Sequence, residues 1–127
     1  TEDILVPNGV ASTKYYSQQS VNVTTINMWN TMVDGNGSWL PALNVEPVAS
    51  NFTSCIDLEI QNTHSVTFNV DVAIGNLIIN TGGTAVLSND KTLTLERDLT
   101  VNGALTPNQS TVVMDGLFGD TKGAQTI

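Results

Sequence analysis

Positive charge is the scarcest feature of this 127-residue chain. Only 4 residues are Lys or Arg, against 12 Asp or Glu, so the formal net charge is −8. Binding to the phosphate backbone of nucleic acids requires clustered basic side chains, and anionic membrane surfaces attract the same groups. The composition therefore argues against a nucleic-acid partner and against attachment to an anionic membrane surface.

Cysteine and histidine are each represented once. Cys55 has no second cysteine for an internal disulfide, and the apolar residue after it indicates a small buried side chain. His64 is the one histidine, and a metal site built from His and Cys ligands would need more of both. General-base catalysis would require an orienting partner for His64, so we expect a hydrogen bond at a chain corner instead.

Long apolar runs are also missing. No segment is long and apolar enough to cross a bilayer, and no apolar stripe shows the 3.6-residue period of a helix. We therefore expect an all-β protein without a transmembrane segment. The chain has instead many short segments of alternating apolar and polar residues, separated by Asn, Asp, Gly and Pro, which is typical of half-buried strands joined by turns.

Three of these segments share the pattern Asp/Asn, Leu, any residue, Ile/Val, Asn/Gln. They are Asp57-Leu58-Glu59-Ile60-Gln61, Asn76-Leu77-Ile78-Ile79-Asn80 and Asp98-Leu99-Thr100-Val101-Asn102. The second begins 19 residues after the first, and the third begins 22 residues after the second. Each is followed by two more alternating segments. A repeat of this length indicates stacked units, and three strands per unit indicate coils of a parallel β-helix.

We predict a short parallel β-helix (β-solenoid) of about three coils with an irregular N-terminal cap. The predicted ranges are 1–56 for the cap or arm and 57–127 for the solenoid, with coils at 57–75, 76–97 and 98–116 and the start of a fourth from 117. Trp29 and Trp39 are the expected anchors of the cap, because a solenoid needs a terminal unit that covers its open end. A β-sandwich is the alternative, since short strands with regular turns suit it too.

The alternation also assigns the side chains that point inward. The predicted core consists of Leu58, Ile60, Leu77, Ile79, Leu93, Leu95, Leu99, Val101, Val112 and Met114. At one corner of the coils, Gln61, Asn80 and Asn102 would form a ladder of side-chain amides that satisfies backbone groups where the chain bends.

Two groups of polar residues are candidate sites. Asp34, Asn36 and Ser38 place oxygen atoms at alternate positions in a Gly-rich loop, as a Ca²⁺ loop begins, but the Glu expected at the twelfth position is missing. A plain turn is the favoured interpretation, with Ca²⁺ the one cofactor left open. Arg97 and Asp98 could serve a polysaccharide lyase, yet no convergent set of residues completes such a site, so we expect no catalytic residues and no enzyme.

Several segments together resemble secreted surface proteins of Bacteroidota exported by the type IX system. The segments are Tyr15-Tyr16, Trp29 to Trp39, Asn62 to Thr67, Asn76 to Thr84, Leu99 to Gly103 and Gly123 to Ile127. Proteins of that kind are typically large, multi-module adhesins, fibres or carriers of other domains. The resemblance implies an extracellular or cell-surface location and a role in structure or adhesion.

The leading functional prediction is a non-enzymatic structural or adhesion module of a secreted cell-surface protein. The first alternative is a filament subunit joined by strand addition, for which Ile4-Leu5-Val6 or Val21-Asn22-Val23 could supply the added strand. The second is a carbohydrate- or ice-binding domain. Ice binding needs Thr-x-Thr strands on successive coils, and Thr92-Leu93-Thr94 supplies only one of them.

The C-terminal edge of the stack should need a cover. Ala124, Gln125, Thr126 and Ile127 look like the opening strand of a further coil, and the edge of a last coil is a template for another strand. We therefore expect a protein partner, self-association or a continuation of the same chain at this edge.

Overall fold

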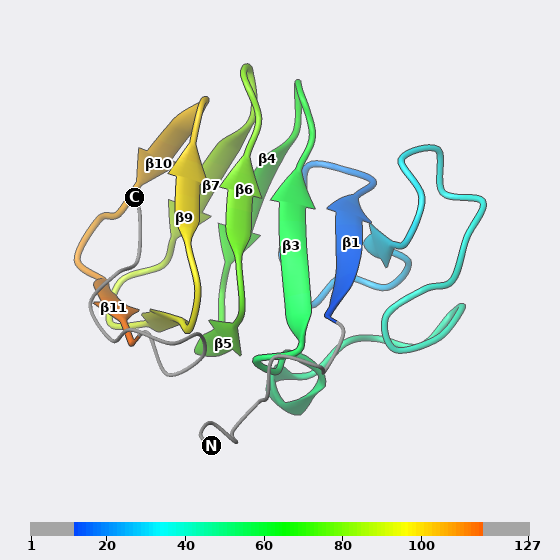
Figure 1. Ribbon diagram of the computed structural model, residues 1–127, viewed down its shortest axis with the longest axis horizontal. Helices are drawn as coiled ribbons and strands as arrows, with labels where there is room; N and C mark the ends of the chain where they lie inside the picture. The colour runs from blue at the N-terminus through cyan, green and yellow to red at the C-terminus, as the bar shows by residue number, and fades with distance from the viewer. Residues whose placement is uncertain (1–11, 116–127) are drawn as a thin grey trace.

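The computed structural model describes residues 12–115, which form parallel strands stacked in three walls (Figure 1). The first wall contains β3 (Ile56–Ile60), β6 (Leu77–Ile79) and β9 (Leu99–Val101). The second contains β4 (Ser65–Phe68), β7 (Thr84–Leu87) and β10 (Ala104–Thr106). The third contains β5 (Val72–Ile74), β8 (Thr92–Leu95) and β11 (Thr111–Met114). All pairs within the walls are parallel, which confirms the β-solenoid and excludes the sandwich.

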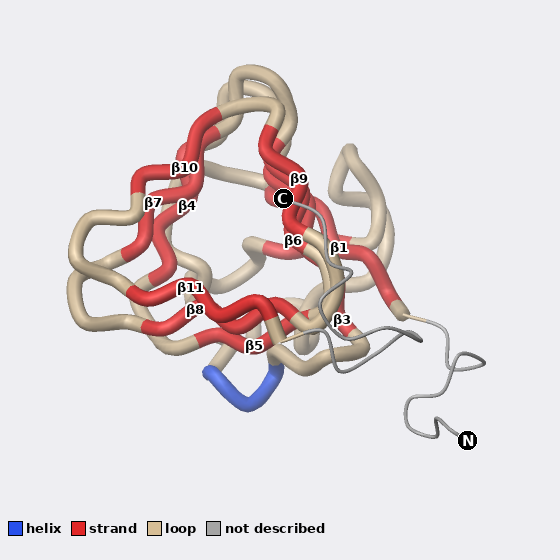
Figure 2. Tube along the Cα trace, turned by 60° about the vertical axis from the view of Figure 1, so that its left-hand side comes forward, coloured by secondary structure: helices blue, strands red, loops and turns tan. Residues whose placement is uncertain are grey.

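The register places equivalent residues of successive coils above one another. Leu58 pairs with Leu77 and Leu77 with Leu99, so the shared sequence pattern becomes one column of the first wall. The other walls follow the same rule, for example with Ile74 beside Leu95 and Leu95 beside Met114. Figure 2 shows the three walls around a triangular interior, which apolar side chains fill.

Burial of the predicted core residues falls along the stack. In the first two coils Leu58, Ile60, Leu77, Ile79, Leu93 and Leu95 are buried. In the third coil Leu99 is buried at 3% exposure, whereas Val101, Val112 and Met114 are half-buried and pack against the core. The difference arises because a coil in the middle of a stack has apolar neighbours on both sides.

Part of the stretch expected to be an irregular cap continues the stack. β1 (Thr13–Ser17) pairs in parallel with β3, with Tyr15 beside Leu58. β2 (Trp29–Asn30) then pairs with β1 in the antiparallel direction and ends the five-stranded sheet. The sequence pattern did not reveal β1 as a rung because Tyr15 and Ser17 stand where the other coils have Leu and Ile or Val.

The segment Val21-Asn22-Val23 lies against the second wall of its own chain. Asn22 forms a parallel bridge with Thr67, and the backbone amides of Val23 and Thr67 donate to the carbonyls of Thr67 and Val21. These backbone groups are therefore already paired, and the segment does not have the conformation of an arm that would pair with a neighbour. The other proposed arm, Ile4-Leu5-Val6, lies outside the described residues.

The two tryptophans occupy different positions at this end of the stack. Trp29 is fully buried, and its indole Nε1 donates to the carbonyl oxygen of Val23 at 3.1 Å. Trp39 is half-buried and forms an antiparallel bridge with Asn30. Trp29 thus packs into the apolar core at the end of the stack that β1 forms. Trp39 lies close to Gly35 in the loop that follows β2.

Candidate functional site

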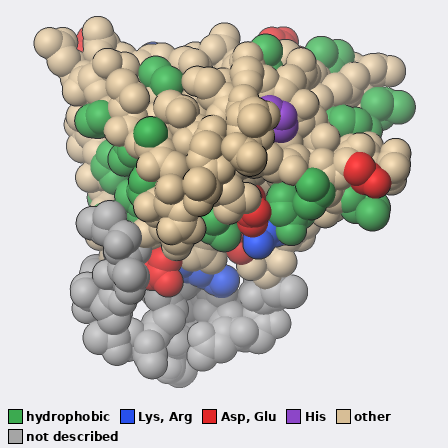
Figure 3. All heavy atoms as spheres, turned by 90° about the horizontal axis from the view of Figure 1, so that it is seen from above, with side chains coloured by type: hydrophobic (Ala, Val, Ile, Leu, Met, Phe, Trp, Pro, Cys, Tyr) green, Lys and Arg blue, Asp and Glu red, His purple; other side chains and the backbone are tan. Residues whose placement is uncertain are grey.

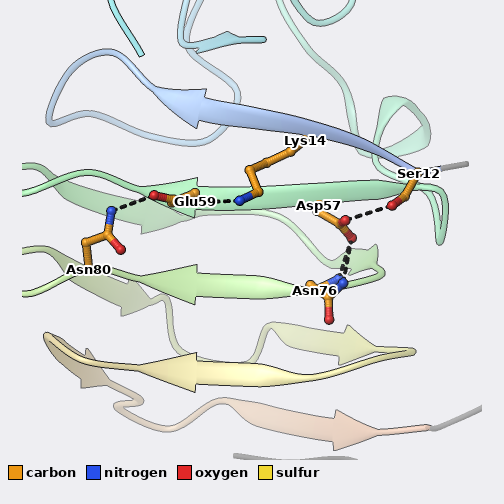
Figure 4. A network of polar contacts seen from close by, with 6 residues as sticks. All are labelled: Ser12, Lys14, Asp57, Glu59, Asn76 and Asn80. Carbon is orange, nitrogen blue, oxygen red and sulfur yellow. Dashed lines mark hydrogen bonds and ion pairs between the residues drawn. The ribbon is translucent and has the colours of Figure 1, made fainter. Parts of the chain in front are cut away.

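In the first two repeats, the first residue connects its coil to the next. Asp57 Oδ1 accepts a hydrogen bond from the backbone N–H of Asn76 at 2.8 Å, and Asn76 Oδ1 accepts one from the N–H of Asp98 at 2.8 Å. Ser12 Oγ donates to the other oxygen of Asp57 at 2.9 Å (Figure 4). These side chains satisfy amides at a corner where the strand ladder is interrupted, which is the physical reason for Asp or Asn at this position.

A second group of polar contacts crosses the outer face of the first wall. Glu59 forms an ion pair with Lys14 at 2.9 Å and accepts a hydrogen bond from Asn80 Nδ2 at 2.6 Å (Figure 4). The hydrogen bond with Glu59 raises the pKa of Lys14, and partial burial opposes that rise. Lys14 Nζ also lies 5.5 Å from the centre of the Tyr16 ring. The group joins three successive strands, β1, β3 and β6.

The expected amide ladder of Gln61, Asn80 and Asn102 is replaced by other contacts. Gln61 Nε2 donates to the carbonyl oxygens of Ser17 at 2.6 Å and Val33 at 3.0 Å, and Asn80 binds Glu59. The ladder prediction was wrong because the Gln61 amide binds two backbone carbonyls, and the Asn80 amide binds the Glu59 carboxylate, which is a stronger acceptor than a neutral amide oxygen.

His64 forms the corner hydrogen bond that the sequence predicted. Its Nδ1 lies 2.7 Å from Ser17 Oγ, which also accepts the backbone N–H of Gln61 at 2.9 Å. Burial lowers the pKa of His64, so the neutral imidazole is favoured. Although this distance suits a nucleophile and its base, the Ser17 side chain is fully buried and cannot reach a substrate. The pair fixes the corner between β3 and β4.

The weak calcium candidate forms a closed turn. Asp34 Oδ1 accepts the backbone N–H of Asn36 at 3.0 Å, and Asp34 Oδ2 accepts Asn36 Nδ2 at 3.0 Å. The backbone N–H of Ser38 donates to Thr31 Oγ1. Within residues 12–115 no group of three or more His, Cys, Asp or Glu side chains is arranged to hold a metal ion.

Arg97 and Asp98, the candidate lyase residues, lie at the corner between β8 and β9. Arg97 Nη1 is 3.5 Å from Ser12 Oγ, and the backbone of Asp98 belongs to the corner contacts of Asp57 and Asn76. Cys55 is half-buried just before β3 and has a free thiol. The proposed assembly edge, Ala124 to Ile127, lies outside the described residues.

A cavity on the third wall was missed by the sequence reasoning. It has a volume of about 300 Å³ and lies where the 3₁₀ helix η1 (Ala49–Asn51) faces β5 and β8. Its lining includes Phe52, Asp71, Thr92 and Thr94. The outward hydroxyls of Thr92 and Thr94 were visible in the alternation, but no sequence signal connects them with Phe52, which lies 40 residues or more away.

One face of the molecule is mainly uncharged. Figure 3 shows one face on which polar uncharged groups predominate and hydrophobic side chains lie in separate groups.

Comparison of the chain with protein-family models, with curated proteins and with solved structures gives no match. Among the described residues no helix has the length and apolar character needed to span a membrane.

Proposed function

We propose that this chain is a non-enzymatic structural or adhesion module of a secreted cell-surface protein. The observation that supports the proposal most is the use of polar side chains as connections between coils. Asp57, Asn76 and Glu59 bind neighbouring coils on the first wall, and Asp71 and Asn89 accept backbone amides of Thr92 and Gln109 on other corners. Groups that an enzyme would aim at a substrate are here directed along the stack, which favours a self-supporting rod.

The extracellular part of the proposal rests on the resemblance to secreted surface proteins of Bacteroidota, and the same resemblance suggests type IX export. It is tested by adding proteinase K or a specific antibody to intact cells of the source organism. We expect the protein to be accessible before lysis, while a cytoplasmic control protein is protected. Accessibility only after lysis would contradict the proposed location.

The non-enzymatic part is tested on the purified protein. Pectin, alginate and related polymers are incubated with it in the presence and absence of Ca²⁺, and new reducing ends and unsaturated products are measured. We expect no products above the buffer control. Product formation that disappears in Arg97→Ala or Asp98→Ala would show that the protein is a lyase.

A filament subunit is a second candidate, favoured by the last described coil. Among residues 12–115, β9, β10 and β11 are terminal in their sheets, and the inward side chains Val101 and Met114 are only half-buried. Three partner strands, one for each wall, would extend the stack and cover these side chains. Negative-stain imaging and sedimentation at several concentrations test this candidate, because strand addition predicts rods that lengthen with concentration.

A further inference from the structure

The cavity beside η1 combines an apolar side with a polar side. Phe52, Ala49 and Ala73 contribute apolar groups, with Phe52 itself almost fully buried. The polar side consists of Asp71, Thr92 and Thr94. Figure 2 shows η1 outside the third wall next to β5, so the cavity faces away from the core. Its volume of about 300 Å³ falls at the lower end of the range of small-molecule sites.

The wall holds the polar groups in fixed positions. Ala73 pairs with Thr94 across β5 and β8, and Asp71 Oδ1 accepts the backbone N–H of Thr92 at 2.9 Å. Among the described residues, Asp71 Oδ2 receives no hydrogen bond, and the Asp71 side chain is exposed. Threonine is stiff at χ1, so the side chains of Thr92 and Thr94 lose little conformational entropy when a ligand binds.

We propose that this cavity binds one neutral pyranose unit of a glycan. A pyranose has an apolar C–H face that would lie against Ala49 and Ala73, the exposed apolar residues of the lining. Its hydroxyl groups would donate to Asp71 Oδ2 and exchange hydrogen bonds with Thr92 and Thr94. An entirely apolar ligand would leave these polar groups without partners, and an anionic ligand would be repelled by Asp71. The biological setting of this glycan binding rests on the proposed adhesion role.

Titration of ¹⁵N-labelled protein with methyl glycosides of glucose, galactose, mannose and N-acetylglucosamine tests the proposal by NMR. We expect saturable shifts, for at least one glycoside, of the amides of Ala73, Thr92 and Thr94, with a dissociation constant in the millimolar range. Asp71→Asn retains an acceptor for the Thr92 N–H but removes the charge, and should weaken binding about tenfold or more, as loss of a charge-assisted hydrogen bond does. Thr94→Val, which keeps the shape of the side chain, should weaken binding as well.

Two matched variants serve as controls. Glu46→Gln removes one exposed carboxylate in the loop before η1, and Thr100→Val removes one exposed hydroxyl on the first wall. Both should bind as the unchanged protein does. The proposal is overturned if no glycoside gives saturable shifts or if the shifts map to another wall. It is also overturned if n-butylamine, a small organic cation that Asp71 would attract, binds at these residues and the glycosides do not. Any of these results leaves the surface-accessibility test of the proposed function unaffected.

Discussion

Thr63 adopts a backbone conformation that β-branched residues rarely adopt. Its φ is 72°, and the residue one coil above at the same corner is Gly82 with φ 84°. The left-handed region costs ordinary residues about 1–2 kcal/mol, and Asn tolerates it better than Thr. We therefore expect Thr63→Asn to raise the free energy of unfolding by about 0.5–1 kcal/mol in urea denaturation. Thr81 is exposed and lies outside the left-handed region, so Thr81→Asn should not raise the free energy of unfolding. An equal increase for both variants would show that the backbone conformation of Thr63 is not the cause.

The His64 imidazole should make stability depend on pH. Burial lowers its pKa from the ordinary value of 6.5, so the unfolded chain binds more protons near that pH than the folded chain does. The neutral His64 imidazole therefore contributes to stability above the pKa of the unfolded chain. This contribution is lost as the pH falls from that value through the lower pKa of the folded protein. Between about pH 7.5 and about pH 5.5 we expect the Tm of the unchanged protein to fall relative to that of His64→Gln.

The comparison of these two proteins removes the effects of other titrating groups. Burial and Asp115 raise the pKa of Glu96, so its contribution to stability decreases as the pH rises, and the same change occurs in both proteins. Parallel Tm curves for the unchanged protein and His64→Gln would show that His64 does not contribute to the pH dependence.

At the scale of the elements, the alternation of each strand should separate tolerated from damaging substitutions. Leu77 is fully buried between the coils of β3 and β9, whereas Thr100 on β9 is exposed. Leu77→Asp should therefore unfold the stack, with a loss of more than about 4 kcal/mol, because a charge without a partner replaces an apolar side chain. Thr100→Asp should change the Tm only slightly. Equal melting temperatures in circular dichroism would invalidate the assignment of inward and outward faces.

The strands of the three coils were predictable because each coil repeats the same inward positions. The column of Leu58, Leu77 and Leu99 follows directly from the recurring pattern, since an inward residue of one coil can pack only on the corresponding residue of the next. β1 escaped prediction because it lies between β3 and the antiparallel β2 rather than between two coils, and there Tyr15 and Ser17 replace the aliphatic pair. The bond from Asn76 to Asp57 and the cavity at Phe52 depend on contacts between coils, which no local pattern encodes.

At the scale of the whole molecule, a stack held by neighbour contacts should be least stable at the coil with the fewest neighbours. The second coil, β6 to β8, lies between two others, and its inward residues Leu77 and Leu95 have no exposed surface. In the last described coil Val101 and Met114 are half-buried. Local opening requires less free energy where less apolar area is buried. We expect amide hydrogen exchange measured by mass spectrometry to be slower in residues 77–95 than in residues 99–114.

The same exchange measurement distinguishes a single stack from an assembling one. If partner strands cover β9, β10 and β11, protection of residues 99–114 should increase with protein concentration, because association stabilises by mass action. Residues 77–95 already have neighbours on both sides and should change little. Concentration-dependent protection confined to 99–114 would support strand addition at the last described coil. Slow exchange there at every concentration would show that this coil is covered within the single chain, and the filament candidate would then lose its structural support.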